Sequence, residues 1–176
     1  MRTYKIIIFG FITMLVFSCC KGGGTNISLA GEWQFTLDST DIGIKESWHT
    51  KEFSERISLP GTTDEAGKGV PNSLEPAITK PQILHPTRKY SYVGPAWYKK
   101  EVNIPNNWKE TNIHLKLERV IWETSVWIDG KEIKEKGESL IAPQYFDLTE
   151  YLTPGKHTIC LRIDNRKKYD ISAGNM

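Results

Sequence analysis

Short runs in which apolar and polar residues alternate recur along the chain, separated by Gly, Pro, Asn and Asp. The clearest run lies at residues 112–120, where every second residue from Ile113 to Leu117 is apolar and His114 and Lys116 stand between them. This period of two is typical of a half-buried strand. No long run has the helical period. The pattern therefore predicts an all-β sandwich or barrel.

A second strand is predicted at residues 124–128, and Asp129-Gly130 follows it directly. Residues 131–133 then continue as a further strand-like run. Asp-Gly between two strands is a strong signal for a tight type I′ hairpin, because both central residues of that turn need positive φ. We therefore expect these two runs to pair.

A third strand is predicted at residues 157–164, with Ile159, Leu161 and Ile163 on its inner face. Cys160 then lies on the opposite face. This position favours a structural thiol over a reactive one.

Two connections stand out from the strand pattern. Residues 147–152 predict one short helical turn, because Asp147 can cap it and Glu150 stands where a capping box is completed. Between Pro60 and Pro86 several prolines and glycines interrupt the chain and no strand pattern remains. We interpret this segment as a long surface excursion, which in a compact domain is often functional.

The N-terminus begins with a short basic stretch, and residues 6–17 are uncharged and almost wholly apolar. This run is too short for a membrane-spanning helix, which needs about 20 residues, and it fits an export signal. Residues 16–19 resemble the bacterial lipobox, which implies a signal peptide at residues 1–18 and lipidation of Cys19. An ordinary cleaved signal and an uncleaved anchor are the alternatives. The resemblance implies an exported protein, lipid-anchored to the cell envelope and facing the periplasm or the outer surface.

Removal of the predicted signal also changes the net charge of the chain. Arg2 and Lys5 are its only charged residues, so the remaining chain holds 21 basic and 21 acidic residues. This balance removes the main argument for nucleic acid or an anionic membrane surface as a partner. Residues 19–28 are rich in Gly and predict a flexible tether to a domain at 29–176. With three cysteines in all, the domain must rely on a hydrophobic core and not on disulfides.

Seven short motifs, taken together and in this order, resemble the N-terminal domain of family 2 glycoside hydrolases, the group of β-galactosidases, β-glucuronidases and β-mannosidases. The likeness covers nearly everything after residue 29. One departure is Asp129, where the family usually has Asn, although Asp also suits the turn. The motifs lie at residues 31–35, 59–62, 94–100, 118–124, 126–131, 146–149 and 163–165.

The resemblance implies a jelly-roll β-sandwich of the galactose-binding type. In the full enzyme it would be followed by an immunoglobulin-like domain and a TIM barrel, and the barrel would supply the two catalytic glutamates of a retaining glycosidase that acts on β-linked glycosides. A further strand completes the sandwich in the family, so we expect this chain to be a C-terminally truncated piece that is inactive and poorly folded alone. The alternative is a stand-alone carbohydrate-binding surface lipoprotein.

The chain itself offers little catalytic chemistry. Retaining hydrolysis needs two carboxyls about 5 Å apart, and the adjacent Asp64-Glu65 would point apart on an extended chain, so we interpret them as a solvated loop pair. The four histidines have no zinc-ligand spacing. We therefore assign no catalytic residue, metal or cofactor to this chain.

Four residues are candidates for sugar binding or for a domain interface. The resemblance places Asp164, Asn165 and Arg166 where the sandwich ends and a loop projects toward the barrel. Their side chains can bind sugar hydroxyls or a carboxylate, but we favour a domain interface. Trp97 lies on the mixed face of its strand, and we favour packing over sugar stacking. Residues 62–69 are a weaker candidate of the same kind.

Overall fold

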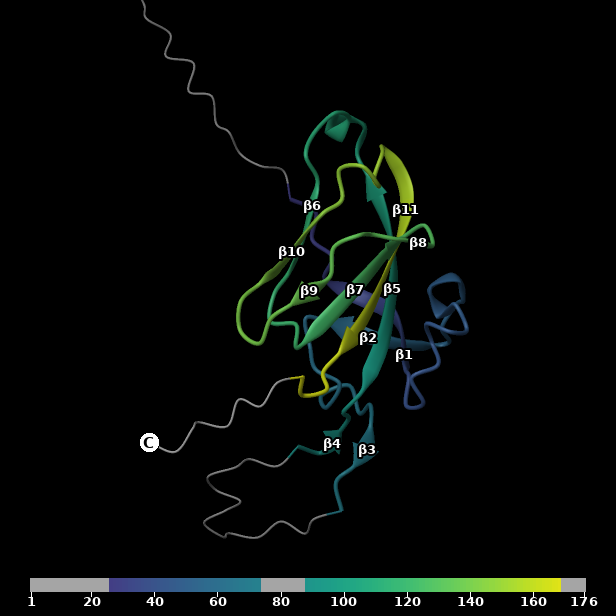
Figure 1. Ribbon diagram of the computed structural model, residues 1–176, viewed down its shortest axis with the longest axis vertical. Coiled ribbons are helices and arrows are strands. Elements are labelled where there is room, and N and C mark those ends of the chain that lie inside the picture. The colour runs from purple at the N-terminus through teal and green to yellow at the C-terminus, as the bar shows by residue number, and fades with distance from the viewer. Residues whose placement is uncertain (1–25, 74–87, 169–176) are drawn as a thin grey trace, which may run out of the picture.

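The computed structural model describes residues 26–73 and 88–168, and the regular elements in these ranges are strands, apart from two short 3-10 helices (Figure 1). The predicted signal, Cys19 and most of the predicted tether lie outside the described residues. In chain order the elements are β1 Gly31–Leu37, η1 Trp48–Thr50, β2 Glu55–Leu59, β3 Val70–Pro71, β4 Tyr90–Ser91, β5 Pro95–Ile104, η2 Asn106–Trp108, β6 His114–Leu117, β7 Glu123–Ile128, β8 Lys131–Glu132, β9 Gly137–Glu138, β10 Gln144–Asp147 and β11 Gly155–Asp164. In the described part of the chain, neither 3-10 helix approaches the length and apolar character that crossing a membrane requires.

The strands form one large sheet and two small ones. The large sheet has the order β2-β1-β5-β11-β7-β8, and β9 also pairs with β7. β10 pairs with β6 in a second sheet, and β3 pairs with β4 in a third. In Figure 1 the β6–β10 layer lies beside the large sheet. The predicted all-β sandwich is confirmed.

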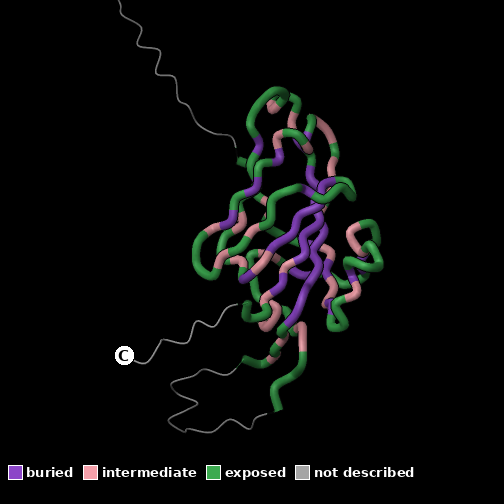
Figure 2. Tube along the Cα trace, in the orientation of Figure 1, coloured by how far each residue is buried: buried purple, intermediate pink, exposed green. Residues whose placement is uncertain are grey.

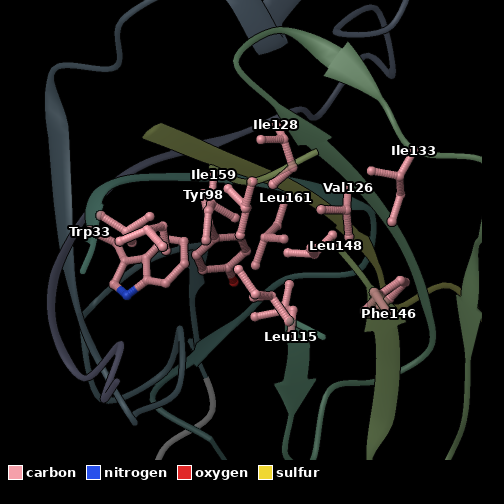
Figure 3. Close-up of a cluster of buried hydrophobic side chains, with 14 of the residues drawn as sticks. Trp33, Tyr98, Leu115, Val126, Ile128, Ile133, Phe146, Leu148, Ile159 and Leu161 are labelled. Atoms are coloured by element: carbon pink, nitrogen blue, oxygen red, sulfur yellow. The ribbon is translucent and has the colours of Figure 1, made fainter. Parts of the chain in front are cut away.

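The main core lies between the large sheet and the β6–β10 layer (Figure 3). Strands β1, β5, β7 and β11 contribute one side of it, and Leu115 of β6 and Phe146 of β10 contribute the other. Phe35 and Tyr98 pack edge to face with ring centroids 5.0 Å apart. Ile27, within the range predicted as tether, also packs against this core.

The outer face of the large sheet carries a second apolar cluster, which we call the outer cluster: Phe53, Trp97, Trp127 and Cys160, with Trp48 packed against it. The central strands β5 and β7 are consequently buried over most of their length, and β11 is buried over half of it (Figure 2). Cys160 is a buried free thiol, as its position on the strand predicted. The segment that supplies Trp48 and Phe53 therefore covers the outer face of the sheet, so that a second buried apolar cluster forms there.

The Asp129-Gly130 hairpin is confirmed. Asp129 has φ 51° and Gly130 has φ 80°, and Ile128 pairs with Lys131 across the turn. Asp129 Oδ1 also accepts a hydrogen bond from the Thr158 N–H at 2.7 Å. The carboxylate at this position thus ties the hairpin to β11.

The short helical turn predicted at residues 147–152 is present as a single turn capped by Asp147, but Glu150 does not complete the predicted capping box. The N–H groups of Tyr151 and Leu152 both donate to the Leu148 oxygen at 3.0 Å, which makes one turn and no helix. Asp147 accepts from the Thr149 N–H at 2.9 Å as a cap would, but its own N–H donates to Glu135. Leu148 and Leu152 are both buried, and β11 starts soon after them, so the chain turns once and enters the strand.

Two strand boundaries also differ from the prediction. The strand expected at residues 112–120 is shorter in the structure, where β6 has only four residues. The excursion expected between Pro60 and Pro86 contains the short β3, which pairs with β4. Residues 74–87 of that excursion lie outside the described residues.

Candidate functional site

The candidate residues gather at the end of the large sheet where β11 finishes and β5 begins. Asp164 is the register partner of Pro95 on one side and of Glu123 on the other. Trp97 is the register partner of Arg162. A turn at residues 38–43, which directly follows β1, closes over this end of the outer face.

Trp97 is held by that turn and has no exposed surface. Its indole Nε1–H donates to Asp38 Oδ2 at 3.0 Å, and its ring lies 5.1 Å from the ring of Trp127. The Gly43 N–H donates to the same Asp38 oxygen at 2.8 Å. A Cβ on Gly43 would lie 2.4 Å from the Trp97 nitrogen. Within the described structure, a sugar cannot reach the Trp97 ring.

Four charged side chains form a closed network beside this turn. Arg162 donates to Asp41 Oδ1 at 2.7 Å and to Asp164 Oδ2 at 3.3 Å. Arg166 donates through Nη2 to Asp41 Oδ2 at 2.7 Å and through Nε to both Asp164 oxygens at 2.9 and 3.0 Å. We call these four residues the Arg–Asp network. Its two positive and two negative charges balance, so it presents no net charge to a ligand.

Ion pairing within the network shifts the pKa values of Asp41, Asp164 and Arg166 in the directions that keep them charged. The hydrogen bond from Arg162 is the main reason that the pKa of Asp41 lies below its ordinary value. Burial alone would raise the pKa of Asp164, but the hydrogen bonds from Arg166 and the charges of Arg166 and Arg162 together outweigh it, so the net pKa is lowered. The hydrogen bonds that Arg166 donates to Asp164 and Asp41 raise the pKa of Arg166. Asp41, Asp164 and Arg166 are thus held in their charged forms.

Asn165 clips the start of β5 to the end of β11. Its Oδ1 accepts a hydrogen bond from the Gly94 N–H at 2.8 Å, and its Nδ2 donates to the backbone oxygen of Tyr92 at 2.9 Å. The Tyr92 hydroxyl in turn donates to the Pro95 oxygen at 2.7 Å. Both ends of the Asn165 amide therefore act within the domain.

The structure brings all four predicted residues to one end of the sheet and adds partners that the sequence did not reveal. Asp38, Asp41 and Arg162 were missed. In the sequence, Asp38, Asp41 and Gly43 indicate only a turn after the first strand, because Asp and Gly are common in turns. Arg162 was visible only as a charged residue on the same strand face as Cys160. Among residues 26–73 and 88–168, no cluster of His, Cys, Asp and Glu is arranged to hold a metal ion.

Asp64 and Glu65 both have structural roles. Asp64 Oδ1 accepts a hydrogen bond from the Tyr90 N–H at 2.8 Å. Glu65 Oε2 accepts from the Thr62 N–H at 3.0 Å, and the Glu65 N–H donates to the Thr62 hydroxyl at 3.1 Å. This reciprocal pair is a capping box. The two carboxylates stabilise the loop and do not face each other as a catalytic pair.

The family model described as glycosyl hydrolases family 2, sugar binding domain, matches residues 27–171 of this chain. The chain belongs to that family. The matched range includes the turn at residues 38–43, the outer cluster, the Arg–Asp network and Asn165. The family assignment based on the sequence motifs is thereby confirmed.

Named relatives and solved structures agree with this assignment. A β-galactosidase of Priestia megaterium is 26% identical over 143 residues, which cover 77% of this chain and 14% of that protein. A β-glucuronidase of Sus scrofa is 25% identical over 141 residues, covering 75% of this chain and 19% of that protein. The structure of Ruminococcus gnavus β-glucuronidase with C6-substituted uronic isofagomine matches with TM-score 0.62 at 23% identity, covering 79% of this chain and 21% of the other. This structural match shows the fold.

These relatives are much longer than this chain. The chain spans between about a seventh and a fifth of their lengths.

Proposed function

We propose that this chain is the N-terminal, non-catalytic domain of a family 2 glycosidase that hydrolyses β-linked glycosides, as β-galactosidases and β-glucuronidases do. The observation that carries the proposal is the family match over residues 27–171, together with relatives of which the chain spans only a fifth or less. The two catalytic carboxylates would come from another domain of the same polypeptide. The 176-residue chain alone is expected to be inactive.

In this enzyme the Arg–Asp network and Asn165 would present a rigid domain end to the catalytic domain. Every charge of the network has a partner inside the domain, and both ends of the Asn165 amide are engaged. Side chains that are bonded in this way hold the shape of the surface, because they would have to break these bonds before binding a ligand. This supports the interface interpretation of Asp164, Asn165 and Arg166 over direct sugar contact.

The proposal is tested by the size and activity of the native product. Cell membranes would be blotted with an antibody raised against residues 29–168, and the detected protein would be assayed on aryl β-galactosides, β-glucuronides and β-mannosides. A band several times larger than 20.1 kDa that hydrolyses one of these substrates supports the proposal. A band of the size of this chain would overturn it and would direct attention to the stand-alone carbohydrate-binding lipoprotein.

We also propose that the protein is exported and lipid-anchored through Cys19. The support is the sequence alone: a basic start, a short apolar run and a lipobox-like stretch before Cys19. Metabolic labelling with a radioactive fatty acid tests this in the host. Cys19→Ser is expected to abolish labelling and Cys20→Ser to retain it; labelling that survives Cys19→Ser would refute the anchor site.

A further inference from the structure

His157, near the start of β11, lies between two oxygen atoms from different segments. Its Nδ1 is 2.6 Å from Asp129 Oδ2, and its Nε2 is 2.7 Å from the backbone oxygen of Thr153. The His157 side chain is only 11% exposed. The ring therefore joins the Asp129-Gly130 hairpin and the turn at residues 148–153 to the same strand.

These two contacts require a ring that carries two protons. A carboxylate and a carbonyl oxygen accept hydrogen bonds and do not donate them, and a neutral imidazole has only one N–H. A neutral ring would set the lone pair of one nitrogen against one of the two oxygens. The imidazolium donates from both nitrogens and satisfies both oxygens.

Loss of one proton leaves a weaker set of contacts at Thr153. The Asp129 carboxylate keeps the remaining proton on Nδ1 of His157, because the partner of one ring nitrogen decides the tautomer. Nε2 can then accept only from the Thr153 N–H at 3.3 Å or from the Thr153 hydroxyl at 3.4 Å. The Thr153 carbonyl oxygen would face a lone pair and would have to move away, which loosens the turn.

Other charged side chains near this end of the sheet face elsewhere. On β5, Glu101 is one position out of register with His157 and so lies on the other face of the sheet. On β11 the neighbouring Lys156 also points to that face. Lys131 of β8 lies over an aromatic ring of the turn, with its Nζ 5.3 Å from the ring centroid. Asp129 is therefore the charged group that faces the His157 ring.

Asp129 is also the residue at which this chain departs from the family, which usually has Asn there. An Asn could still accept from the Thr158 N–H through its oxygen, as Asp129 Oδ1 does at 2.7 Å. Its NH₂ group would then donate to His157 Nδ1, and a neutral ring could donate from Nε2 to the Thr153 oxygen. With Asn the fastening needs no second proton on the ring, whereas with Asp it does.

We propose that Asp129 and His157 form a pH-sensitive latch, which fastens the turn at residues 148–153 to the hairpin while the ring carries two protons and releases the turn when one proton is lost. Histidine in its ordinary environment loses this proton around pH 6.5. The latch is therefore closed in mild acid, and its contact with Thr153 is lost as the pH rises. It lies at the opposite end of β11 from Asp164, and the proposal does not depend on the proposed function.

Hydrogen–deuterium exchange of the native product at pH 6 and pH 8, measured by mass spectrometry, tests the latch. The peptide that contains the Tyr151 and Leu152 amides is followed, because both donate to the Leu148 oxygen inside the turn. Rates are corrected for the intrinsic pH dependence of exchange. A peptide from β2, at the far edge of the large sheet, is the control for a general change in stability.

We expect the protection of the turn in the wild type to fall about fivefold from pH 6 to pH 8, as for the loss of one partly exposed hydrogen bond from a charged group. Equal protection at both pH values would overturn the proposal. Burial lowers the pKa of His49, so its protonation in acid reduces protection; this is the opposite direction and cannot imitate the expected result.

Asp129→Asn is the matched variant, because it keeps the shape of the side chain. It is expected to retain its protection at pH 8, about fivefold above the wild type, since a neutral ring then makes both contacts. Protection equal to or below that of the wild type at both pH values would mean that Asp129 acts by packing alone, against the proposal. His157→Gln should give the same protection at both pH values, and a wild-type pH dependence that survives this change would overturn the latch.

Discussion

Asp41 joins the two arginines of the Arg–Asp network, so its charge is the most informative one to remove. Asp41→Asn is expected to lower the free energy of unfolding by about 1–2 kcal/mol, the range for hydrogen bonds to charged groups reduced for the partial exposure of Asp41. Because the pKa of Asp41 is lowered in the folded protein, this contribution is complete above the ordinary value of about 3.9 and is lost as the pH falls through the folded pKa.

Urea unfolding at pH 7 and at pH 3 measures this difference. The gap between wild type and Asp41→Asn should narrow at pH 3. Glu110→Gln is a suitable control, since Glu110 is exposed and its nearest cation, Lys109, lies at 4.0 Å. An equal gap at both pH values would contradict this account, because it would show that protonation of Asp41 does not remove its contribution in this pH range.

His49 is the residue through which mild acid should destabilise the domain. Its ring stacks on Trp127 with centroids 5.5 Å apart, and its Nδ1 is buried without a hydrogen-bond partner among the described residues. Burial lowers its pKa; Glu132 acts against this shift and Lys99 adds to it. The unfolded chain therefore binds a proton first as the pH falls below about 6.5, and stability decreases until the folded pKa is reached.

The experiment is thermal unfolding by circular dichroism between pH 7 and pH 5. Wild type should lose stability across this window, and His49→Phe, which keeps a ring on Trp127 without a titrating group, should lose much less. His114→Gln, on the exposed face of β6, controls for the loss of a histidine. If the two variants follow the same curve, His49 is not the source of the slope.

At the scale of elements, Gly137 sets the distance between β9 and β10. A Cβ at this position would lie 2.0 Å from the Gln144 Oε1 and 2.5 Å from the Phe146 ring. Gly137→Ala should therefore destabilise the domain by about 1–3 kcal/mol, as overpacking of a tight contact does. The urea midpoint measures it, with the neighbouring exposed Lys136→Ala as control; a midpoint unchanged in Gly137→Ala would mean that β9 is free to move away.

The elements also show which features the sequence could predict. The hairpin at Asp129-Gly130 was predictable because the turn requires positive φ at two successive residues, and few sequences supply it. The single turn at residues 147–152 was predictable from Asp147 as its cap, but Glu150 was the wrong choice of partner for the Asp147 N–H. Its own capping partner, Glu135, is twelve residues earlier in the chain, where no local rule looks for it.

The sequence pattern also did not predict the outer cluster. Alternation assigns one face of a strand to the core and does not show whether the other face of β7 is covered. The turn at residues 38–43 and the segment after it cover that face, so Trp127 is buried as well as Val126. The family motifs placed Asp164, Asn165 and Arg166 at the end of the sandwich. They could not supply the partners of these residues, since the Asp41–Arg162 pair joins residues 121 positions apart.

At the scale of the whole molecule, the geometry predicts that the isolated chain binds simple sugars weakly or not at all. The ring of Trp97 is buried, both ends of the Asn165 amide bond the backbone, and Asp164 and Arg166 satisfy each other. A sugar would have to break these internal hydrogen bonds before it gained its own. The sugar-binding name of the family does not remove this cost, because a fold does not carry a function by itself.

Nuclear magnetic resonance titration with galactose, glucuronate and mannose tests this prediction. We expect no saturable shift of the Gly94, Asn165 and Arg166 amides at millimolar sugar, the concentration at which binding of only about 4 kcal/mol would already be seen. The Asn165→Ala variant, in which the start of β5 loses its hydrogen bonds to the Asn165 side chain, is titrated in the same way as the structural control. Saturable shifts at these amides in the wild-type chain would show a preformed sugar site, and the domain would then contribute binding energy to the substrate as well as a surface to its neighbour.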